Sequence, residues 1–383
     1  RMTDQTDTLP VVRLRPKADA RALRHGFPWV YGDVLVTDRR TRALNPGSLA
    51  RLEDAERRPM GVVAVTPESR IIARMLDRDP EAVIDRSWLA GRFARAQEMR
   101  EPLYEVPFYR LVHAEADGLP GLVIDRFGDA AVVQPNTAWA DRLTDEIAEA
   151  LTEVTGCRTI VKNGTGRARG LEGLPEETAI LTGMIDAPIE VPMNGAIYKA
   201  DLLGGQKTGL FYDQRPNHAF AARFAKGARV LDVFSHVGGF GLAALAAGAI
   251  SATCVDGSAA ALELAEAGAR AAGTADRLST RKGDAFSTME ALAEEGAQFD
   301  LVICDPPAFA PSRKALDAGL RAYERVARLA APLVAPGGYL GLCSCSHAAD
   351  LTKFRNASAR GIGRGGRRAQ LLHTGFAGPD HPM

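Results

Sequence analysis

The sequence has little cysteine and no excess of either charge. Its 383 residues include five cysteines, at positions 157, 254, 304, 343 and 345. An odd, scattered set in a chain of this length excludes the framework of a small disulfide-rich protein, so free thiols in a reducing compartment are expected. The 47 basic residues balance the 47 acidic ones, so net charge alone does not indicate a nucleic-acid partner.

Long hydrophobic runs are also missing. The longest apolar stretches, such as residues 242–250, are far shorter than the ~20 residues that a membrane span needs, and the first residues lack the basic-then-apolar pattern of a signal peptide. The 46% hydrophobic and 25% charged content is that of an ordinary globular chain. We therefore expect a cytoplasmic protein of two or three domains, with no membrane partner.

The first 80 residues favour strands. Short runs rich in β-branched residues alternate with turn signals such as Asn45-Pro46-Gly47, which predicts a small all-β domain at residues 1–80. The strands are expected at 11–15, 33–37, 48–53, 61–66 and 71–76.

The next segment, 81–194, is predicted to hold a linker helix and a small α+β middle domain. Apolar side chains at helical spacing predict the linker helix over 81–101; they are Val83, Ile84, Trp88, Leu89 and Phe93. Strands on both sides of a Gly128-Asp129 turn and a helix near 140–154 should follow.

From residue 195 to 383, predicted strands and helices alternate. This pattern is typical of an α/β fold with a doubly wound parallel sheet, whose ligands bind at the carboxyl ends of the strands. Acids stand at three successive strand ends: Asp232, Asp256 and Asp284. An acid after the second strand commonly holds a ribose diol, and three carboxylates would repel a pyrophosphate.

These strand ends therefore predict an adenosyl ligand without phosphates. Glycines after the first strand would let the backbone approach it. The candidate residues here are Asp232, Phe234, Ser235, Gly238, Gly239, Asp256, Ser258, Asp284 and Ala285. The alternative is that the acids are helix N-caps, a position that Asp favours.

The fourth strand ends in Asp305-Pro306-Pro307. Two prolines directly after a buried strand fix a rigid turn that holds the acid outward. In enzymes that use S-adenosylmethionine, this position faces the base being modified. Asp305 is therefore a candidate for both the catalytic and the cofactor site.

The fifth strand ends in LCSCSH. Cys343, Cys345 and His347 would share one face of a strand, but zinc sites favour wider gaps and a fourth ligand, so we predict no metal. Buried cysteines are usually core residues, which suits Cys254, Cys304 and Cys343.

Cys345 stands at the strand tip. A thiolate there could add to carbon 6 of cytosine and activate carbon 5 for methylation, with the sulfonium, basic neighbours or His347 helping it to ionise.

Residues 351–370 contain six basic residues and no acid: Lys353, Arg355, Arg360, Arg364, Arg367 and Arg368. Such a block could follow a line of phosphates. It could equally reflect a general bias of the chain, since only eight of its 47 basic residues are Lys.

Taken in order, these motifs resemble a known family. RVLDVFSHVGGFGLAAL, VDGS, DPPAFAPSRK and LCSCSH, with GGQKTGLFYDQR at 204–215, are similar to bacterial 23S ribosomal RNA cytosine-C5 methyltransferases with an N-terminal PUA domain. The resemblance runs from about residue 12 to 382, through HGFPWVYGDV and ADGLPGLVIDRFGD. It implies a Rossmann-like class I methyltransferase domain at 195–383 and a PUA-like domain at 1–80.

The resemblance also implies roles. S-adenosylmethionine would be the methyl donor, Cys345 the nucleophile, and Asp305 the residue that orients the base. The segment GQKTGLFYDQR would cover the cofactor through Phe211, Asp213 and Arg215. The PUA and middle domains would grip 23S ribosomal RNA or a large-subunit precursor, and a homodimer is compatible with this picture.

The chain also departs from the family. Ala308 follows Pro307 where other RNA cytosine-C5 enzymes have a second cysteine, so one catalytic thiol is expected. The family usually continues past an Asp-His-Pro into a final strand pair, and this chain stops at Met383, so the sheet is expected to lack its last strand. Glycines in 351–372 should weaken the helix expected there.

Two other functions remain open on the sequence. An amino-group methyltransferase of RNA needs the Asp-Pro-Pro motif but no thiol. A catalytically inert PUA-containing RNA-binding or ribosome assembly factor would need neither, although the acids at 232, 256, 284 and 305 argue against such decay.

Overall fold

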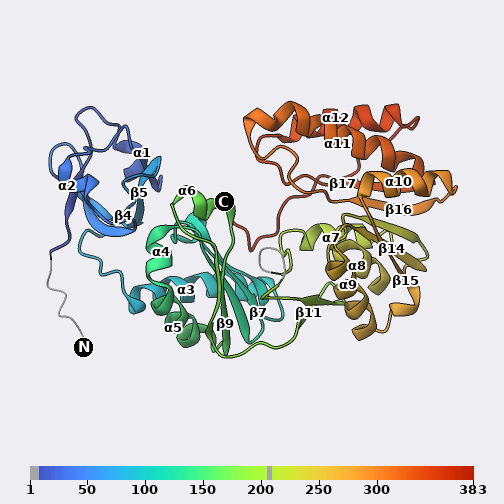
Figure 1. The fold of residues 1–383 in the computed structure, drawn as a ribbon, viewed down its shortest axis with the longest axis horizontal. Coiled ribbons are helices and arrows are strands. Elements are labelled where there is room, and N and C mark those ends of the chain that lie inside the picture. The colour runs from blue at the N-terminus through green and yellow to red at the C-terminus, as the bar shows by residue number, and fades with distance from the viewer. Residues whose placement is uncertain (1–7, 205–208) are drawn as a thin grey trace. The chain divides into compact units, whose positions relative to one another are not determined.

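The computed structural model describes residues 8–204 and 209–383, in two compact units (Figure 1). The first unit falls within Arg1–Ala187, Leu202–Gly209 and Pro379–Met383, and the second within Pro188–Asp201 and Leu210–Gly378. Each unit can contain more than one domain, so the boundaries predicted at 80 and 194 stay predictions. Across the described residues, no helix is long and apolar enough to cross a membrane.

The first unit begins with a five-stranded sheet of order β1-β3-β4-β5-β2. Its elements are β1 Val11–Arg13, α1 Arg21–Arg24, β2 Trp29–Tyr31, α2 Arg39–Arg42, β3 Ser48–Glu53, β4 Pro59–Val65 and β5 Ile71–Asp77. The expected β-rich character is confirmed, but a strand over 33–37 is wrong. Only Leu35 there pairs, in an isolated bridge with Leu14, and the strand lies earlier, at β2.

A second five-stranded sheet, of order β10-β9-β8-β7-β6, completes the first unit. Its elements are α3 Arg86–Arg100, the 3-10 turns Glu101–Leu103 and Ala114–Asp117, β6 Phe108–His113, β7 Leu122–Phe127, β8 Ala130–Pro135, α4 Ala138–Arg142, α5 Thr144–Thr155, β9 Thr159–Gly164, α6 Arg167–Leu171 and β10 Glu177–Thr182. The expected hairpin is confirmed, because β7 and β8 pair antiparallel across Gly128, whose φ is 67°.

Two helices of this unit differ from the prediction. The linker helix begins only at Arg86, because the carboxylate of Asp85 accepts a hydrogen bond from the Trp88 N–H and caps it. Val83 therefore precedes the helix and is exposed. The helix expected at 140–154 is two helices, α4 and α5, which meet at Leu143.

The end of the chain is anchored in the first unit. Asp380 is fully buried, and its carboxylate accepts a hydrogen bond from the Arg110 N–H at 2.9 Å. Its carbonyl accepts another from the Arg100 guanidinium at 3.1 Å. Arg100 also forms an ion pair with Asp117 at 2.8 Å, in which both side chains are almost completely buried.

The second unit contains a five-stranded sheet in which all strands are parallel, with the order β15-β14-β13-β16-β17. Its strands are β13 Arg229–Val233, β14 Ser251–Asp256, β15 Leu278–Lys282, β16 Phe299–Cys304 and β17 Val334–Leu342, and a hairpin of β11 Ile189–Met193 and β12 Ala196–Ala200 precedes them. The predicted doubly wound α/β sheet is confirmed, and residues 367–383 add no strand to it.

Helices cover both faces of this sheet (Figure 1). They are α7 Arg215–Ala222, α8 Gly239–Ala246, α9 Ala259–Ala271, α10 Ala285–Glu294, α11 Leu316–Ala330 and α12 Leu351–Arg364, with 3-10 turns at Ala275–Arg277, Arg313–Ala315 and Ala331–Leu333. Leu231, Val233 and Val255 point toward α10 and α11 and share a core with them, whereas α8 and α9 lie against the other face together with β12.

The helix that glycines were expected to weaken is regular over 14 residues. Asp350 caps it by accepting a hydrogen bond from the Lys353 N–H at 2.8 Å. Gly361 is buried against α11, where an added Cβ would collide with the Glu324 carbonyl and lie 2.6 Å from the Ala327 Cβ. One glycine of the segment is therefore what allows α12 to pack closely on α11.

We predict opposite effects for two substitutions in this helix. Gly361→Ala should lower the free energy of unfolding by about 1–3 kcal/mol, because the methyl group overpacks the contact with α11. Gly363→Ala is the matched control, since nothing lies within 4 Å of its added Cβ, and it should stabilise by up to about 1 kcal/mol through helix propensity. Urea unfolding followed by circular dichroism measures both. Equal effects of the two variants would contradict the packing argument.

Candidate active site

The carboxyl ends of the central strands meet at one edge of the second unit's sheet. Beyond the paired strands, the Ser235 N–H donates to the Val255 carbonyl at 3.0 Å, and the Asp305 N–H donates to the Val233 carbonyl at 3.2 Å. The Cys343 N–H in turn donates to the Cys304 carbonyl at 3.0 Å. The loops that carry the candidate residues therefore leave the sheet side by side.

The turn after β13 is tightly wound. Phe234 and His236 both have positive φ, at 60° and 50°, and Gly238 has φ 89° where α8 begins. The turn is closed by the Gly238 N–H, which donates to the Ser235 carbonyl at 2.8 Å. Gly239 packs on α7, where an added Cβ would lie 2.5 Å from Nε2 of the buried His218. Packing against His218 therefore favours glycine at position 239 whether or not a ligand binds nearby.

Asp232 supports this turn from inside the fold. It is fully buried, and its Oδ2 accepts a hydrogen bond from the Gly241 N–H at 2.8 Å. Its Oδ1 has no hydrogen-bond partner among the described residues. Burial raises the pKa of Asp232 to about 7, with the charges of Asp305 and Asp256 adding to the increase and the bond from Gly241 opposing it.

The carboxylates of Asp256 and Asp284 accept hydrogen bonds from different parts of the site. Asp256 accepts from the backbone N–H of His236 and of Ser258, both at 2.8 Å, so it ties the turn after β13 to the end of β14. Asp284 is the N-cap of α10 and accepts from the N–H and Oγ of Ser287, and this bonding lowers its pKa. The N-cap alternative therefore holds for Asp284 and not for Asp232 or Asp256.

Ser258 and Ala285 occupy the first turns of two helices. Ser258 is the N-cap of α9 and accepts a hydrogen bond from the Ala261 N–H at 3.1 Å. Ala285 is the first residue of α10 and is buried.

Three phenylalanines form a cluster beside the strand ends. The ring of Phe234 lies 6.3 Å from the rings of both Phe286 and Phe309, and the latter two lie 6.2 Å apart. Phe234 was predicted from the sequence, whereas Phe286 and Phe309 were not. Their signal was available, because Phe286 follows the third acid by two residues and Phe309 follows the two prolines.

The segment before α7 reaches the same edge. Phe211 meets the His236 ring edge to face, with centroids 5.2 Å apart. Oδ1 of Asp213 is buried with no hydrogen-bond partner among the described residues. The guanidinium carbon of Arg215 lies 5.0 Å from the Tyr212 ring. Residues 205–208 of the predicted covering segment lie outside the described residues.

Asp305 and Cys345 lie on neighbouring loops. Oδ1 of Asp305 accepts a hydrogen bond from Nε2 of Gln214 at 3.2 Å, and Sγ of Cys345 lies 4.0 Å from the Pro306 carbonyl oxygen. The loop of Cys345 is fastened by Ser346, whose Oγ accepts from the Ala310 N–H at 2.9 Å and bonds the Tyr323 hydroxyl at 2.5 Å. These bonds hold Cys345 beside the Asp-Pro-Pro turn.

The expected face of Cys343, Cys345 and His347 is wrong. β17 ends at Leu342, so the alternation of a strand does not apply to them. In the described part of the chain, no group of three His, Cys, Asp or Glu residues could hold a metal ion.

The five cysteines, all within the described residues, differ sharply in exposure. Cys157, Cys254 and Cys304 are buried, Cys343 is half-buried, and Cys345 alone is exposed. Burial raises the pKa of the Cys254, Cys304 and Cys343 thiols. Cys345 is therefore the thiol that water and a substrate can reach.

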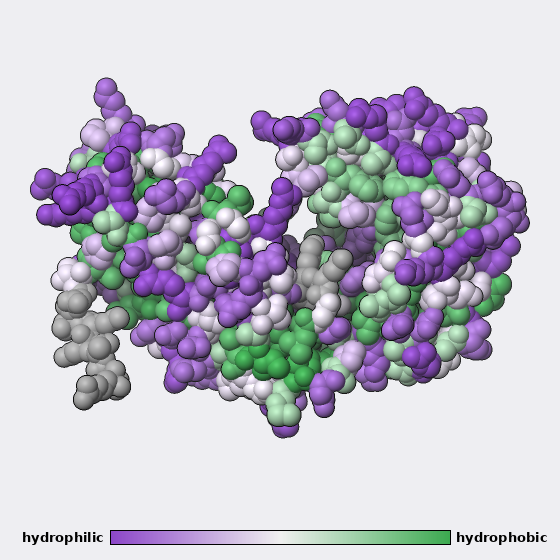
Figure 2. Space-filling model, in the orientation of Figure 1, coloured by the Kyte–Doolittle hydropathy of each residue, from purple (hydrophilic) through white to green (hydrophobic). Residues whose placement is uncertain are grey.

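The basic segment at 351–370 is partly used within the second unit. Arg360 and Arg364 form ion pairs with Glu324 of α11, at 3.9 and 3.0 Å, and Arg367 donates to the Ala331 carbonyl at 2.9 Å. Hydrophilic residues nevertheless cover the outer edge over α12 (Figure 2). A phosphate contact of this segment stays a prediction.

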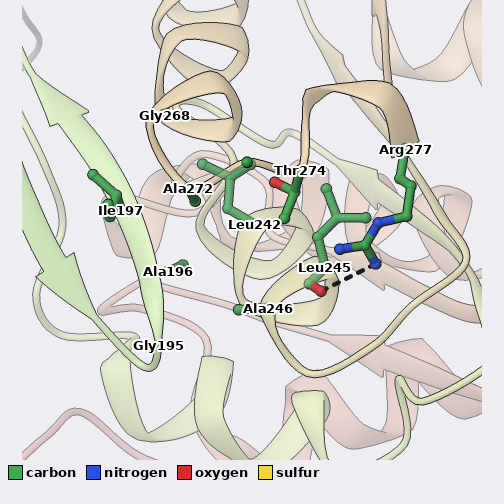
Figure 3. A pocket seen from close by; sticks show the side chains of 11 residues that line it. Gly195, Ala196, Ile197, Leu242, Leu245, Ala246, Gly268, Ala272, Thr274 and Arg277 are labelled. Carbon is green, nitrogen blue, oxygen red and sulfur yellow. Dashed lines mark hydrogen bonds between the residues drawn. The ribbon is translucent and has the colours of Figure 1, made fainter.

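A cavity of about 280 Å³ lies between the β11–β12 hairpin and the C-terminal ends of α8 and α9 (Figure 3). Leu242, Leu245 and Arg277 line it, and the Arg277 guanidinium donates to the Leu245 carbonyl at 3.3 Å. It shares no residue with the strand ends that carry the candidate site.

Comparison with known proteins agrees with this architecture. The family of S-adenosylmethionine-dependent methyltransferases matches residues 177–361, and the PUA-like domain family matches residues 12–78. The predicted combination of a Rossmann-like methyltransferase fold with a PUA-like domain is thereby confirmed.

Two relatives match along almost the whole chain. The chain is 34% identical over 380 residues to the ribosomal RNA large subunit methyltransferase I of Shewanella denitrificans, and 33% identical over 380 residues to that of Pseudoalteromonas atlantica. Each match covers 97% of this chain and 94% of the relative.

Two solved structures share the fold. A candidate SAM-dependent methyltransferase from Streptococcus mutans superposes with a TM-score of 0.78 at 19% identity, covering 98% of this chain and 96% of that one. A second candidate methyltransferase, complexed with SAH, gives a TM-score of 0.79 at 18% identity, with the same coverage.

We predict that Asp232 makes stability depend on pH. Its folded pKa of about 7 exceeds the ordinary value near 4, so the folded state binds the extra proton and stability falls as pH rises from about 4 to 7. Asp232→Asn, which mimics the protonated acid, should unfold at nearly the wild-type urea concentration at pH 4. At pH 8 it should be more stable by on the order of 1–4 kcal/mol. An equal difference at both pH values would refute the assignment.

Proposed function

Because the chain belongs to the ribosomal RNA large subunit methyltransferase I family, we propose that it methylates carbon 5 of a cytosine in 23S ribosomal RNA. Methyl transfer from S-adenosylmethionine follows from the family. The base, the carbon atom and the thiol mechanism are the proposal. The observation that carries them is the exposed Cys345 beside the Asp305-Pro306-Pro307 turn.

The strand ends fit S-adenosylmethionine. The phenylalanine cluster offers an apolar face for an adenine ring. Asp256 stands where a ribose is commonly held. Oδ1 of Asp213, which is buried and has no hydrogen-bond partner among the described residues, is an acceptor suited to an ammonium group. We propose that the remaining predicted residues shape the same site, with Asp232 acting through the turn that it supports. The full set is Phe211, Asp213, Arg215, Asp232, Phe234, Ser235, Gly238, Gly239, Asp256, Ser258, Asp284, Ala285 and Asp305. When bound, the cofactor supplies an electrophilic methyl group.

Cys345 supplies what carbon 5 of cytosine lacks. Its thiolate adds to carbon 6, the Sγ–C6 bond forms, and the C5=C6 electron pair becomes available at carbon 5. Once carbon 5 carries the methyl group, its proton leaves to a base, the C5=C6 bond re-forms and the Sγ–C6 bond breaks. The thiolate is thereby regenerated.

Asp305 orients the base in this proposal. A carboxylate accepts hydrogen bonds, and the exocyclic amino group of cytosine donates them. The Asp305 turn and the Cys345 loop are joined through Ser346, so both groups approach the base from one side of the sheet edge.

The RNA partner is proposed to be 23S ribosomal RNA or a large-subunit precursor, gripped in part by the PUA-like domain. A methyltransferase of ribosomal RNA works where ribosomes are assembled, so we propose the cytoplasm as its compartment. The homodimer considered above stays a prediction.

We predict that Cys345→Ala lowers methyl transfer to 23S RNA by more than about a thousandfold, because the nucleophile is lost. Binding of S-adenosylmethionine, measured by calorimetry, should be unchanged. Cys343→Ser is the matched control and should retain activity within about tenfold. Full activity of Cys345→Ala would overturn the thiol mechanism and favour methylation of an amino group, and no cofactor binding by the wild-type chain would favour an inert RNA-binding protein.

A second prediction concerns the product. Deletion of the gene should remove one 5-methylcytosine from 23S ribosomal RNA, and mass-spectrometric mapping of RNA from the deleted strain measures this. The wild-type gene should restore the modification, and the gene for Cys345→Ala should not. An unchanged modification map would count against the proposed substrate.

A further inference from the structure

A chain of three side chains ends at Asp305. Nδ2 of Asn217 donates to the Phe376 carbonyl at 3.3 Å and to Oε1 of Gln214 at 2.7 Å, and Nε2 of Gln214 donates to Oδ1 of Asp305 at 3.2 Å. Gln214 is the N-cap residue of α7, and Asn217 lies in the first turn of that helix. All four residues belong to the second unit.

The backbone carbonyl of Phe376 fixes the direction of these hydrogen bonds. A carbonyl oxygen can only accept, so the amide nitrogen of Asn217 must face Phe376 and the same nitrogen serves Gln214. Gln214 consequently turns its oxygen to Asn217 and its nitrogen to Asp305. Asp305 receives a donor on Oδ1, which favours the ionised carboxylate.

The anchor of the chain is itself held on α7. His373 stacks on Phe220, with ring centroids 3.7 Å apart and planes 15° apart. The Gly378 N–H donates to the Asp213 carbonyl at 3.1 Å, and Gly375 packs so closely on Asn217 that a Cβ would collide with Oδ1. The Phe376 carbonyl is thus fixed on both sides.

We propose that Gln214, oriented by Asn217, is a positioning residue that makes the enzyme select cytosine. It keeps Asp305 an ionised acceptor, which suits the exocyclic amino group of cytosine. Uracil would place its O4, another acceptor, against the same carboxylate, and facing acceptors are unfavourable. This inference rests on the proposed function, since it concerns the base that Cys345 attacks.

The chain can be reversed by a nearly isosteric change. In Asn217→Asp, a carboxylate faces the Phe376 carbonyl and Oε1 of Gln214, so Gln214 gains by turning its nitrogen toward residue 217 and its oxygen toward Asp305. Gln214→Glu removes the donor directly, but a protonated Glu can donate again. Gln214→Ala removes both groups. Gln298→Glu, at an exposed position just before β16 and so at the amino end of that strand, makes the same charge change and is the control.

The test uses the full-length protein, S-adenosylmethionine and in vitro transcribed 23S RNA containing 5-fluorocytidine. Fluorine at carbon 5 cannot leave as a proton does, so the methylated Sγ–C6 adduct accumulates and its rate is read on a denaturing gel. We expect Gln214→Ala and Asn217→Asp to form the adduct at least about tenfold more slowly than wild type. Gln298→Glu should match wild type, and calorimetry should show unchanged cofactor binding in all variants.

The pH profile separates positioning from a structural role. The activity of Gln214→Glu relative to wild type should rise by about tenfold or more between pH 8 and pH 6, because protonation restores a donor toward Asp305. A flat ratio, or wild-type rates for Gln214→Ala and Asn217→Asp, overturns the inference.

If wild type itself forms no adduct, the proposed function falls and this inference falls with it. If Gln214→Ala does not fold, the two nearly isosteric variants decide the question.

Discussion

Parallel pairing of β13 with both β14 and β16 is the constraint from which the site follows. Parallel strands end at one edge, and the connections on the two sides of β13 leave in opposite directions, which opens a crevice there. The turn after β13, the Asp305 loop and the Cys345 loop all leave from this edge. Extra backbone bonds at Ser235, Asp305 and Cys343 continue the pairing past the strand ends. The loops are therefore placed by the sheet as much as by their own residues.

The edge combines exposed and buried ionisable groups with different roles. Asp232 is buried at an electrostatic cost, yet it holds the N-terminal turn of α8 through Gly241. Cys254 and Cys304 are equally buried and unsuited to ionise. Cys345 is exposed, and the group that fixes its loop is the neighbouring Ser346. The residues that hold the turn and the loop in place are thus different from Cys345, the proposed nucleophile.

Much of the second unit could be predicted from the sequence, because its signals are local. The strand β14 ends at Asp256, where the sequence predicted an acid at a strand end, and this prediction follows from the alternation of strand and helix. What failed depends on tertiary contacts. The glycines of α12 were predicted to weaken this helix, yet Gly361 packs closely against α11. Phe286 and Phe309 follow the predicted acid and prolines closely in the sequence, but their packing with Phe234 is a tertiary contact that the sequence does not show.

The same limit explains the hydrogen-bond chain to Asp305. Gln214 lies inside the quoted segment GGQKTGLFYDQR, but its partner is 91 residues further along the chain. Spacing in the sequence cannot reveal such a pair. The strand predicted at 33–37 also depends on long-range pairing, because Leu35 forms only an isolated bridge with Leu14, whereas β2 pairs with β5.

The buried Asp380 has a consequence for dividing this protein into pieces. Residues 379–383 belong to the first unit although they follow the whole of the second, and residues 188–201 belong to the second although they come before part of the first. The polypeptide therefore passes between the units repeatedly, and no single cut in the gene separates them cleanly. A fragment ending at 187 would leave Arg100 and the Arg110 N–H without the acceptors that Asp380 provides. Dissection by expression of isolated halves needs a fused or permuted chain in which that short terminal piece travels with its own unit.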